Sequence, residues 1–262
     1  MLLKDKVLIL SGIGPGLGVK LALEAAREGA HGLALASRSP QKLDDAEHRI
    51  REFNTHCRLL KVPTDITDPA QCRRLAEHTV QTFGRIDGLV NSAFVYGSSQ
   101  PVADGALTDW TDVLNTNLLG TLQMSQAVLP TMKAQGHGAI VNVNTSATVE
   151  TNPGEGSYAA SKAALIAATR HFAREVGRHG IRVNTARLGW LWGVPVQKAL
   201  AQQAQAEGRT VDDIKRRIEK KIALNRMMTD DECARAALFL VSDYAVAVSG
   251  ATLDINGGEF MP

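Results

Sequence analysis

Seven short apolar runs recur along the chain, and the longer segments between them have apolar residues at a helical period. The runs are Val7 to Leu10, Gly32 to Ala36, Arg58 to Val62, Gly88 to Asn91, Ala139 to Val143, Ile181 to Thr185 and Thr252 to Ile255. Runs that are apolar on both faces and alternate with helices predict parallel strands covered on each side. Right-handed crossovers between such strands make the sheet doubly wound. We therefore expect an α/β fold around a seven-stranded parallel sheet.

The length and composition predict one domain. The chain has 262 residues, 44% of them hydrophobic, and no linker or repeat divides residues 1–262. The longest stretch without an expected strand runs from Val194 to about Asp230 and contains a charged amphipathic helix from Asp212 to Lys221. Ligands bind outside the carboxyl ends of the strands in doubly wound sheets, so we interpret residues 190–228 as a substrate lid. The charges of the helix alone indicate only a solvated face.

Several classes of function are disfavoured. Cys57, Cys72 and Cys233 are odd in number and widely spaced, and the seven His show no ligand spacing, so we expect neither disulfides nor a metal site. The formal net charge of +2 gives no basic stripe for nucleic acid. The first apolar run is too short for a signal peptide or a membrane span, so we expect a cytoplasmic protein.

A glycine-rich segment lies between the first expected strand and the first expected helix. Its residues are Ser11, Gly12, Ile13, Gly14, Pro15, Gly16, Leu17 and Gly18. Glycines let the backbone approach a pyrophosphate closely, and a helix N-terminus supplies free N–H donors. This context favours a Rossmann-like dinucleotide site over an ordinary turn.

Tyr158 and Lys162 are four residues apart, which places them on one face of a helix. A phenol titrates near pH ~10 in water and becomes a useful base only when a nearby cation favours the phenolate. Lys162 is such a cation. The spacing alone is also typical of a solvated helix face.

The motifs together resemble the short-chain dehydrogenase/reductase family over nearly the whole chain. They are Ser11 to Gly18, Asp65-Ile66, Asn91-Ser92-Ala93, Asn117, Tyr158-x-x-x-Lys162 and Gly257-Gly258. The glycine spacing, with Pro15 where the epimerase branch has glycine, resembles the single-domain oxidoreductase branch. The short gap between Tyr158 and Lys162 is unlike that of the enoyl reductase relatives.

The resemblance implies an NAD(P)-dependent oxidoreductase acting on a secondary alcohol or ketone. In the family mechanism, Tyr158 exchanges a proton with the substrate oxygen while hydride passes to or from the nicotinamide. Lys162 lowers the phenol pKa and binds the nicotinamide ribose, and Asn117 anchors a water that links Lys162 to solvent. Asn117 falls in a long helix expected from Trp110 to Pro130; alone, it would indicate only a surface amide.

The resemblance also implies a hydroxyl that polarises the substrate carbonyl, usually a Ser thirteen positions before the Tyr. Thr145 occupies that position and Ser146 follows it. A threonine hydroxyl can donate the same bond, although its methyl group restricts χ1. We favour Thr145, with Ser146 as the alternative.

The end of the second strand bears on cofactor choice. Family members that prefer NAD usually have an Asp where Ser37 stands, and Arg38 suits a 2′-phosphate, so we favour NADP(H) modestly over NAD(H). Pro15 lacks the basic side chain of many NADP-preferring relatives, and Arg38 could instead stack on adenine or cap a loop. The resemblance further assigns Asp65 to the adenine amino group and Ile66 to the ring, although Asp65 could simply cap the next helix.

The residues beside the expected nicotinamide depart from the family pattern. Phe94 follows Asn91, Ser92 and Ala93 where Gly is usual, and Arg187 to Trp192 replaces a Pro-Gly turn. Leu188, Gly189 and Leu191 are candidates for holding the carboxamide. Phe94, Tyr96, Trp190 and Trp192 suggest a hydrophobic substrate, aromatic or polycyclic, although single aromatic residues are more often core.

Two further expectations concern the whole protein. The fold could bind a dinucleotide as a catalytically silent sensor or scaffold, but the presence of both Tyr158 and Lys162 favours an enzyme. The resemblance implies a homo-oligomer, a tetramer or a dimer, formed through the long fourth and fifth helices and the C-terminal segment.

Overall fold

The computed structural model describes residues 1–53 and 56–261 and contains one seven-stranded parallel sheet. The strand order is β3-β2-β1-β4-β5-β6-β7, and every pair is parallel. The strands are β1 (Val7–Ser11), β2 (Gly32–Ser37), β3 (Arg58–Pro63), β4 (Gly88–Asn91), β5 (Gly138–Thr145), β6 (Ile181–Leu188) and β7 (Thr252–Ile255). The expected doubly wound α/β fold is confirmed.

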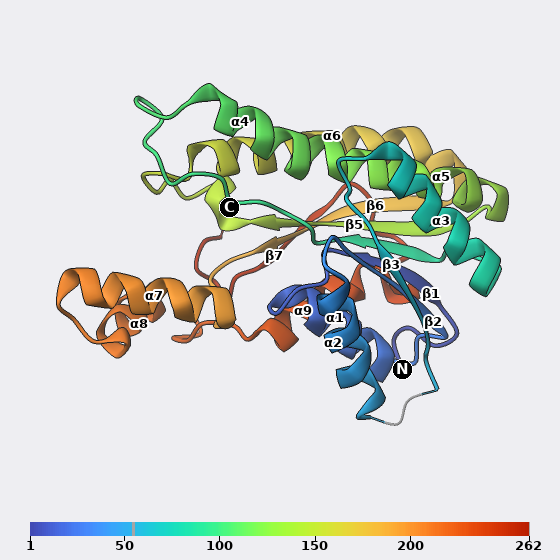
Figure 1. Cartoon of the computed structure of the whole chain (residues 1–262), viewed down its shortest axis with the longest axis horizontal. Coiled ribbons are helices and arrows are strands. Elements are labelled where there is room, and N and C mark those ends of the chain that lie inside the picture. Colours follow the sequence, from blue (N-terminus) through green and yellow to red (C-terminus); the bar gives the residue numbers. More distant parts are fainter. Residues whose placement is uncertain (54–55, 262) are drawn as a thin grey trace.

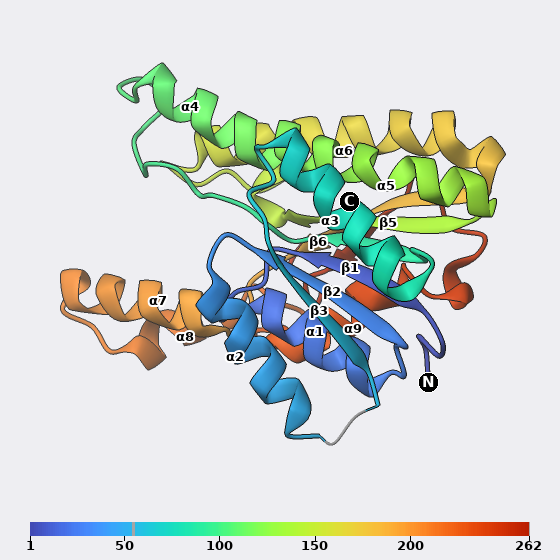
Figure 2. The ribbon, with the colours of Figure 1, turned by 45° about the vertical axis from the view of Figure 1, so that its right-hand side comes forward.

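Helices cover both faces of the sheet (Figures 1 and 2). One layer contains α1 (Leu17–Arg27), α2 (Pro40–Arg51) and α9 (Asp230–Phe239); the other contains α3 (Pro69–Phe83), α4 (Leu107–Leu114), α5 (Thr121–Gln135) and α6 (Gly156–Val176). Each layer buries its own apolar cluster against the sheet, because strands such as β1 are buried on both sides.

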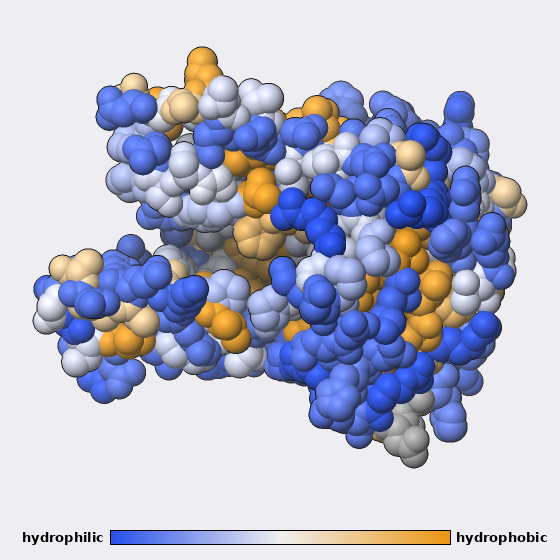
Figure 3. Space-filling model, viewed as in Figure 1, coloured by the Kyte–Doolittle hydropathy of each residue, from blue (hydrophilic) through white to orange (hydrophobic). Residues whose placement is uncertain are grey.

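The strand order reverses between β1 and β4, and this switch point places the ligand site. The two helices α7 (Val194–Glu207) and α8 (Val211–Glu219) project from the body beyond the carboxyl ends of the strands (Figure 1). A deep hollow separates this projection from the layer that carries α4, and apolar residues show at its base (Figure 3). The hollow is the cleft in which we place the site.

Two details differ from expectation. β5 and β6 extend to Thr145 and Leu188. The apolar runs end earlier because the last residues of these strands include polar and charged side chains, such as Asn144 and Arg187, which are nevertheless buried. The long helix expected from Trp110 to Pro130 is interrupted by a π-helical turn, η1 (Asn115–Gly120). π-turns in helices often lie at functional sites.

The three cysteines are buried and unpaired, and burial raises the pKa of each thiol. Across residues 1–53 and 56–261, no helix has the length and apolar character needed to cross a membrane.

Candidate active site

The glycine-rich turn joins β1 to α1 at the switch point. Gly12 has φ +97°, and a Cβ there would lie 2.2 Å from the backbone nitrogen of Ala93. A Cβ on Gly18 would lie 2.1 Å from the carbonyl oxygen of Gly12. Both positions therefore require glycine. Gly14 keeps open space, since the nearest atom to its Cβ would be 4.0 Å away.

The turn also leaves polar groups free. Gly16 is the N-cap of α1 and offers no side-chain cap; the Val19 N–H donates to the Gly14 carbonyl, while no side chain caps the N–H groups of Leu17 and Gly18. The Ser11 hydroxyl is buried and has no hydrogen-bond partner in the described part of the chain. Leu17 opens the helix, and Pro15 precedes the cap. A cradle with free N–H donors and an unused hydroxyl fits a dinucleotide pyrophosphate.

Asn91, Ser92 and Ala93 border this turn because β1 pairs with β4, with Ser11 opposite Asn91. The Ser92 N–H donates to the Ser11 carbonyl at 2.8 Å. The Asn91 amide donates to Asn142 at 2.9 Å and to Ser125 at 3.0 Å, which fixes the end of β4. The two segments form one surface at the strand ends.

The end of β2 opens on a cavity of about 600 Å³ lined by Arg38, Asp65 and Arg74 among others. Arg38 is exposed, while the Ser37 hydroxyl accepts a bond from the Ser39 N–H. Two guanidinium groups beside one cavity can bind a phosphate. Asp65 accepts bonds from the N–H and hydroxyl of Thr67, and it is Asp68 that caps α3.

Ile66 is buried and packs against the π-turn. A Cβ on Gly120 would lie 2.9 Å from Ile66 Cγ1, so this contact uses the absence of a side chain at position 120. The resemblance assigns Ile66 to the adenine ring. In the structure, Ile66 follows β3 and packs against Gly120 of η1.

Lys162 and Tyr158 lie one turn apart near the start of α6. Lys162 is 3% exposed, and its ammonium donates to the carbonyl oxygen of Val143 on β5 at 2.9 Å. Burial lowers the pKa of Lys162 to about 8, because the charged form loses hydration. Lys162 is thus a buried cation. The alternative that its spacing from Tyr158 reflects only a solvated helix face is wrong.

Tyr158 is half-buried, and burial raises its pKa to about 12. A hydrogen bond with the Thr145 side chain acts in the opposite direction, and the negative charge of Glu155 raises the pKa further. This shift is opposite to the one expected from Lys162. The physical reason is that desolvation of the phenolate dominates while the ammonium of Lys162 is engaged by Val143. The phenol is therefore protonated at neutral pH.

Thr145 ends β5, and Ser146 begins the short 3-10 turn η2 (Ser146–Thr148). The Thr145 hydroxyl accepts from the Ala147 N–H at 3.3 Å, and the Thr145 side chain acts to lower the pKa of Tyr158 against the larger effect of burial. The Ser146 carbonyl accepts from the N–H groups of Val149 and Glu150 and fixes the turn. Of the two hydroxyl candidates, Thr145 is the one in contact with Tyr158.

Asn117 is fully buried in the π-turn, with its amide committed to neighbouring groups. Its oxygen accepts from the Val95 N–H at 2.8 Å, and its nitrogen donates to the Val95 carbonyl at 2.9 Å and the Ser161 hydroxyl at 3.0 Å. The side chain clamps the loop after β4 onto α6. Its expected role as a water anchor stays a prediction.

The four aromatic residues predicted to line the substrate pocket lie in two groups. Phe94 and Tyr96 pack on Tyr158, with ring centroids 5.9 Å and 4.9 Å away. Trp190 and Trp192 are partly buried against the core on the side of α7 and α8, and Lys215 lies 4.6 Å from the Trp192 ring. Their place in a substrate pocket stays a prediction.

The segment after β6 is held by its neighbours. Leu188 is buried, the Gly189 N–H donates to Ile255, and Leu191 forms a bridge with Met228. A Cβ on Gly189 would lie 2.6 Å from a carboxylate oxygen of Glu259, so the C-terminal tail closes against this turn.

Known proteins share this architecture and these motifs. A family model described as enoyl-(acyl carrier protein) reductase matches residues 12–259. The chain belongs to the short-chain dehydrogenase/reductase family. It is 33% identical over 262 residues to the 3-oxoacyl-[acyl-carrier-protein] reductase FabG of Thermotoga maritima, covering 98% of this chain and 99% of the relative. It is 31% identical to the levodione reductase of Leifsonia aquatica, covering 97% and 94%.

Solved short-chain dehydrogenase/reductase structures superpose over nearly the whole chain. The L-sorbose reductase of Gluconobacter frateurii, complexed with NADPH and L-sorbose, gives a TM-score of 0.92 at 26% identity and covers 99% of this chain and 98% of its own. An NAD+-bound xylitol dehydrogenase gives 0.88 at 28% identity, covering 97% and 99%. The chain is therefore an NAD(P)-dependent oxidoreductase of this family.

Three residues near the site were not predicted from the sequence: Asn144, Ser161 and Glu155. Asn144 donates to the Lys162 carbonyl and accepts from the Thr145 N–H, so one buried amide joins two site residues. Ser161 bonds with Asn117, and Glu155 accepts from the Tyr96 hydroxyl. Asn142 and Asn144 alternate inside a strand buried on both faces, and this placement of polar residues was the available signal.

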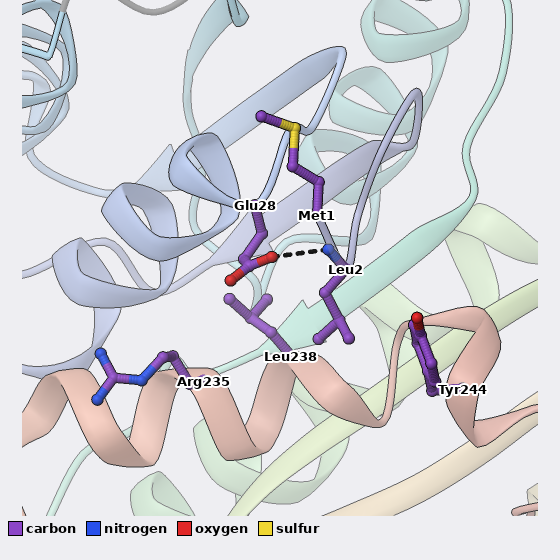
Figure 4. A pocket seen from close by; sticks show the side chains of 6 residues that line it. All are labelled: Met1, Leu2, Glu28, Arg235, Leu238 and Tyr244. Atoms are coloured by element: carbon purple, nitrogen blue, oxygen red, sulfur yellow. Dashed lines mark hydrogen bonds between the residues drawn. The ribbon is translucent and has the colours of Figure 1, made fainter.

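A second cavity, of about 300 Å³, lies at the opposite end of the sheet (Figure 4). Met1, Leu2, Glu28, Arg235, Leu238 and Tyr244 line it. The Glu28 carboxylate accepts from the Leu2 N–H at 2.7 Å and fixes the segment before β1. Because it lies at the amino end of β1, this cavity is remote from the short-chain dehydrogenase/reductase site.

Proposed function

We propose that the protein catalyses reversible hydride transfer between a nicotinamide cofactor and a hydrophobic secondary alcohol or ketone, with Tyr158 as general acid and base. The observation that carries this proposal is the environment of Tyr158: its ring packs against Phe94 and Tyr96, and Lys162 is buried one helical turn away with its ammonium on the Val143 carbonyl. The Thr145 side chain at the end of β5 lowers the pKa of this phenol against the effect of burial. A protonated phenol next to a second hydroxyl can donate to a developing alkoxide.

In this proposal each residue of the site has a distinct task. The cofactor, when bound, supplies or accepts the hydride. Thr145 polarises the substrate oxygen and Tyr158 exchanges its proton. Lys162 holds the nicotinamide ribose. Asn117 keeps the loop after β4 against α6 through its bonds to Val95 and Ser161.

The glycine turn and its neighbours suit the cofactor. Gly12, Gly14, Gly16 and Gly18 give the backbone room, Ser11 offers a free hydroxyl, and Asn91, Ser92 and Ala93 border the same surface. We assign Leu188, Gly189 and Leu191 to the nicotinamide side, since they follow the end of β6 beside Thr145.

NADP(H) is our preferred cofactor because Arg38 and Arg74 flank one cavity and no carboxylate stands at Ser37. Replacing Arg38 by Ala should weaken NADPH binding about 10-fold or more and leave NADH binding within about 2-fold. Arg73→Ala, which removes an exposed guanidinium that does not line the cavity, is the matched control for loss of a nearby charge. Equal weakening of both cofactors by Arg38→Ala contradicts a 2′-phosphate contact.

The hydrophobic substrate class rests on Phe94 and Tyr96, whose side chains are 54% and 39% exposed beside Tyr158. Two exposed aromatic rings at the reacting hydroxyl favour an apolar substrate face. The relatives named above include enzymes of a sugar and a polyol. The substrate class is therefore argued from this chain's own residues.

A panel of ketones and alcohols, assayed with NADPH and NADH by nicotinamide absorbance, tests the function. We expect turnover of bulky apolar or aromatic ketones and faster rates with NADPH. Turnover of small sugars or polyols alone contradicts the substrate class. Tight cofactor binding without turnover of any panel member favours the silent sensor or scaffold.

A further inference from the structure

A second phenol lies against Tyr158. The Tyr96 ring is inclined by 33° to the Tyr158 ring at a centroid separation of 4.9 Å, and Phe94 approaches at 5.9 Å. Val95, between these two residues, is held through both its N–H and its carbonyl by Asn117. The loop that carries Tyr96 is therefore fixed on the π-turn, and the stacking of Tyr96 on Tyr158 is a defined contact.

The Tyr96 hydroxyl donates to Glu155 Oε1 at 2.6 Å, which is a short charge-assisted bond. The other oxygen of Glu155 accepts from Asn152 at 3.1 Å. Glu155 is the N-cap of α6 and precedes Tyr158 by three residues. The carboxylate is thus held from two sides at the start of the helix that carries the catalytic hydroxyl.

A further bond pair fixes the same loop to α6. Asp109 of α4 accepts from the Ser98 N–H at 2.8 Å and from the Ser157 hydroxyl at 3.1 Å. Both carboxylates thus hold this loop against α6, and Glu155 is the one whose charge acts on the phenol of Tyr158.

We propose that Tyr96 and Glu155 form a positioning pair that orients the Tyr158 ring and holds a negative charge at the phenol packed on it. The inference rests on the proposed function, because it assigns the pair a role in proton transfer by Tyr158. Neither residue transfers the proton. Tyr96 sets the ring position, and the carboxylate makes the phenolate less favourable.

The groups that face Tyr158 have opposing effects. Lys162 of α6 contributes a buried ammonium, Thr145 at the end of β5 bonds with the hydroxyl, and Tyr96 contributes a second phenol. The charge of Glu155 raises the pKa of both phenols. The pair thereby adds to the larger effect of burial in favouring the protonated phenol, which is the form that donates to a ketone.

The three tyrosines of the chain, Tyr96, Tyr158 and Tyr244, permit a test that needs no substrate. Protein labelled with ¹³C at tyrosine Cζ would give three resonances, assigned with Tyr158→Phe and Tyr244→Phe variants. Glu155→Gln keeps an acceptor for Tyr96 and removes the charge. We expect the Tyr158 titration to move down by about 0.5 to 1 pH unit. Asp104→Asn, an exposed change on the same loop, should leave it in place.

Kinetics separate the two roles of the pair. Tyr96→Phe should lower kcat by about 3- to 10-fold without changing the cofactor Kd, because the ring loses its anchor. In Glu155→Gln, the rate of alcohol oxidation should rise at a lower pH than in the wild type. This change in pH should equal the change in the Tyr158 titration measured by NMR. An unchanged Tyr158 titration in Glu155→Gln, or an unchanged kcat in Tyr96→Phe, overturns the corresponding half of the proposal.

The outcome is distinguishable from failure of the proposed function. If Tyr158→Phe retains full turnover, the proposed function fails, whatever Glu155 does. If turnover depends on Tyr158 but Glu155→Gln shifts neither the resonance nor the profile, only the charge role of Glu155 fails.

Discussion

At the residue scale, burial acts in opposite directions on the two central side chains. It lowers the pKa of Lys162 to about 8 and raises that of Tyr158 to about 12, because each loses hydration of its charged form. Their spacing predicted a shared helix face, and the structure adds that both meet the end of β5. The sequence could not reveal that desolvation would outweigh the attraction between the two groups.

These shifts predict how rate depends on pH. Carbonyl reduction needs the protonated form of Tyr158, which is present at every pH below its raised pKa. The reduction rate should therefore be maintained at neutral pH. It should decline on the alkaline side, first as Lys162 loses its proton near pH 8. Alcohol oxidation needs the phenolate and should rise with pH. Steady-state rates in both directions from pH 5 to 10 test this, and an oxidation rate that falls as pH rises from 6 to 9 contradicts it.

The contact between Thr145 and Tyr158 predicts unequal roles for the adjacent hydroxyls. Thr145→Ala should reduce kcat about 100-fold or more, whereas Thr145→Ser should retain most activity. Ser146→Ala should stay within about 3-fold, because Ser146 serves the turn through its backbone. Single-turnover rates with bound NADPH measure both effects. Loss of activity in Ser146→Ala alone would reverse the assignment.

At the element scale, the strands and the helix after β4 were predictable, and the π-turn within that helix was not. Apolar runs marked all seven strands. The five inner strands of the sheet are buried between the two helical layers, whereas the edge strands β3 and β7 are only partly buried. The π-turn at Asn115–Gly120 depends on contacts distant in sequence, such as Asn117 with Val95 and Gly120 with Ile66. A helical period carries no signal for such contacts.

The projection formed by α7 and α8, which the sequence predicts to be a substrate lid, is a second feature of this scale. Pro195 at the start of α7 lies against the glycine turn, where a Cβ on Gly16 would be 3.4 Å from its Cδ. Ala223 and Leu224 after α8 donate to the carbonyls of Gly258 and Gly257. The projection therefore contacts the cofactor turn at one end and the C-terminal tail at the other.

We predict that cofactor binding orders this projection. Hydrogen exchange of the α7 amides should slow by about 5-fold or more when NADPH is added, because the neighbouring turn becomes fixed. Amides of α3, on the far layer and away from the lid, provide the internal control. Equal exchange of α7 with and without NADPH contradicts the lid interpretation.

At the scale of the whole molecule, two exposed apolar side chains lie in the segment where we predict self-association. Leu107 is 78% exposed on α4, and Leu119 is 48% exposed on the π-turn. Both belong to the segment through which the family resemblance implies a dimer or tetramer. Exposed apolar residues grouped on one helical layer are typical of an interface.

We therefore predict a homo-oligomer that depends on this layer. Wild-type protein should sediment as a dimer or tetramer, and Leu119→Arg should shift it toward a smaller species, because a charge at an apolar interface is costly. Tyr244→Arg, also exposed but at the other end of the sheet, is the control. A monomeric wild type contradicts the prediction.

The fold and the motifs could be predicted from the sequence, while the environment of the site could not. Glycine positions and the spacing of Tyr158 and Lys162 are visible in the chain. The role of Asn144, which joins Thr145 to Lys162, and the bond from Tyr96 to Glu155 arise only when separate segments meet. Such contacts decide proton affinity and orientation, and they leave no periodic pattern.

The most direct measurement is single-turnover hydride transfer from bound NADPH to an accepted ketone, comparing wild type with Tyr158→Phe. The phenylalanine variant keeps the ring that Phe94 and Tyr96 contact and loses only the hydroxyl. Our account predicts unchanged NADPH binding and a rate at least about 1,000-fold lower. A variant that binds NADPH and transfers hydride at the wild-type rate would contradict it.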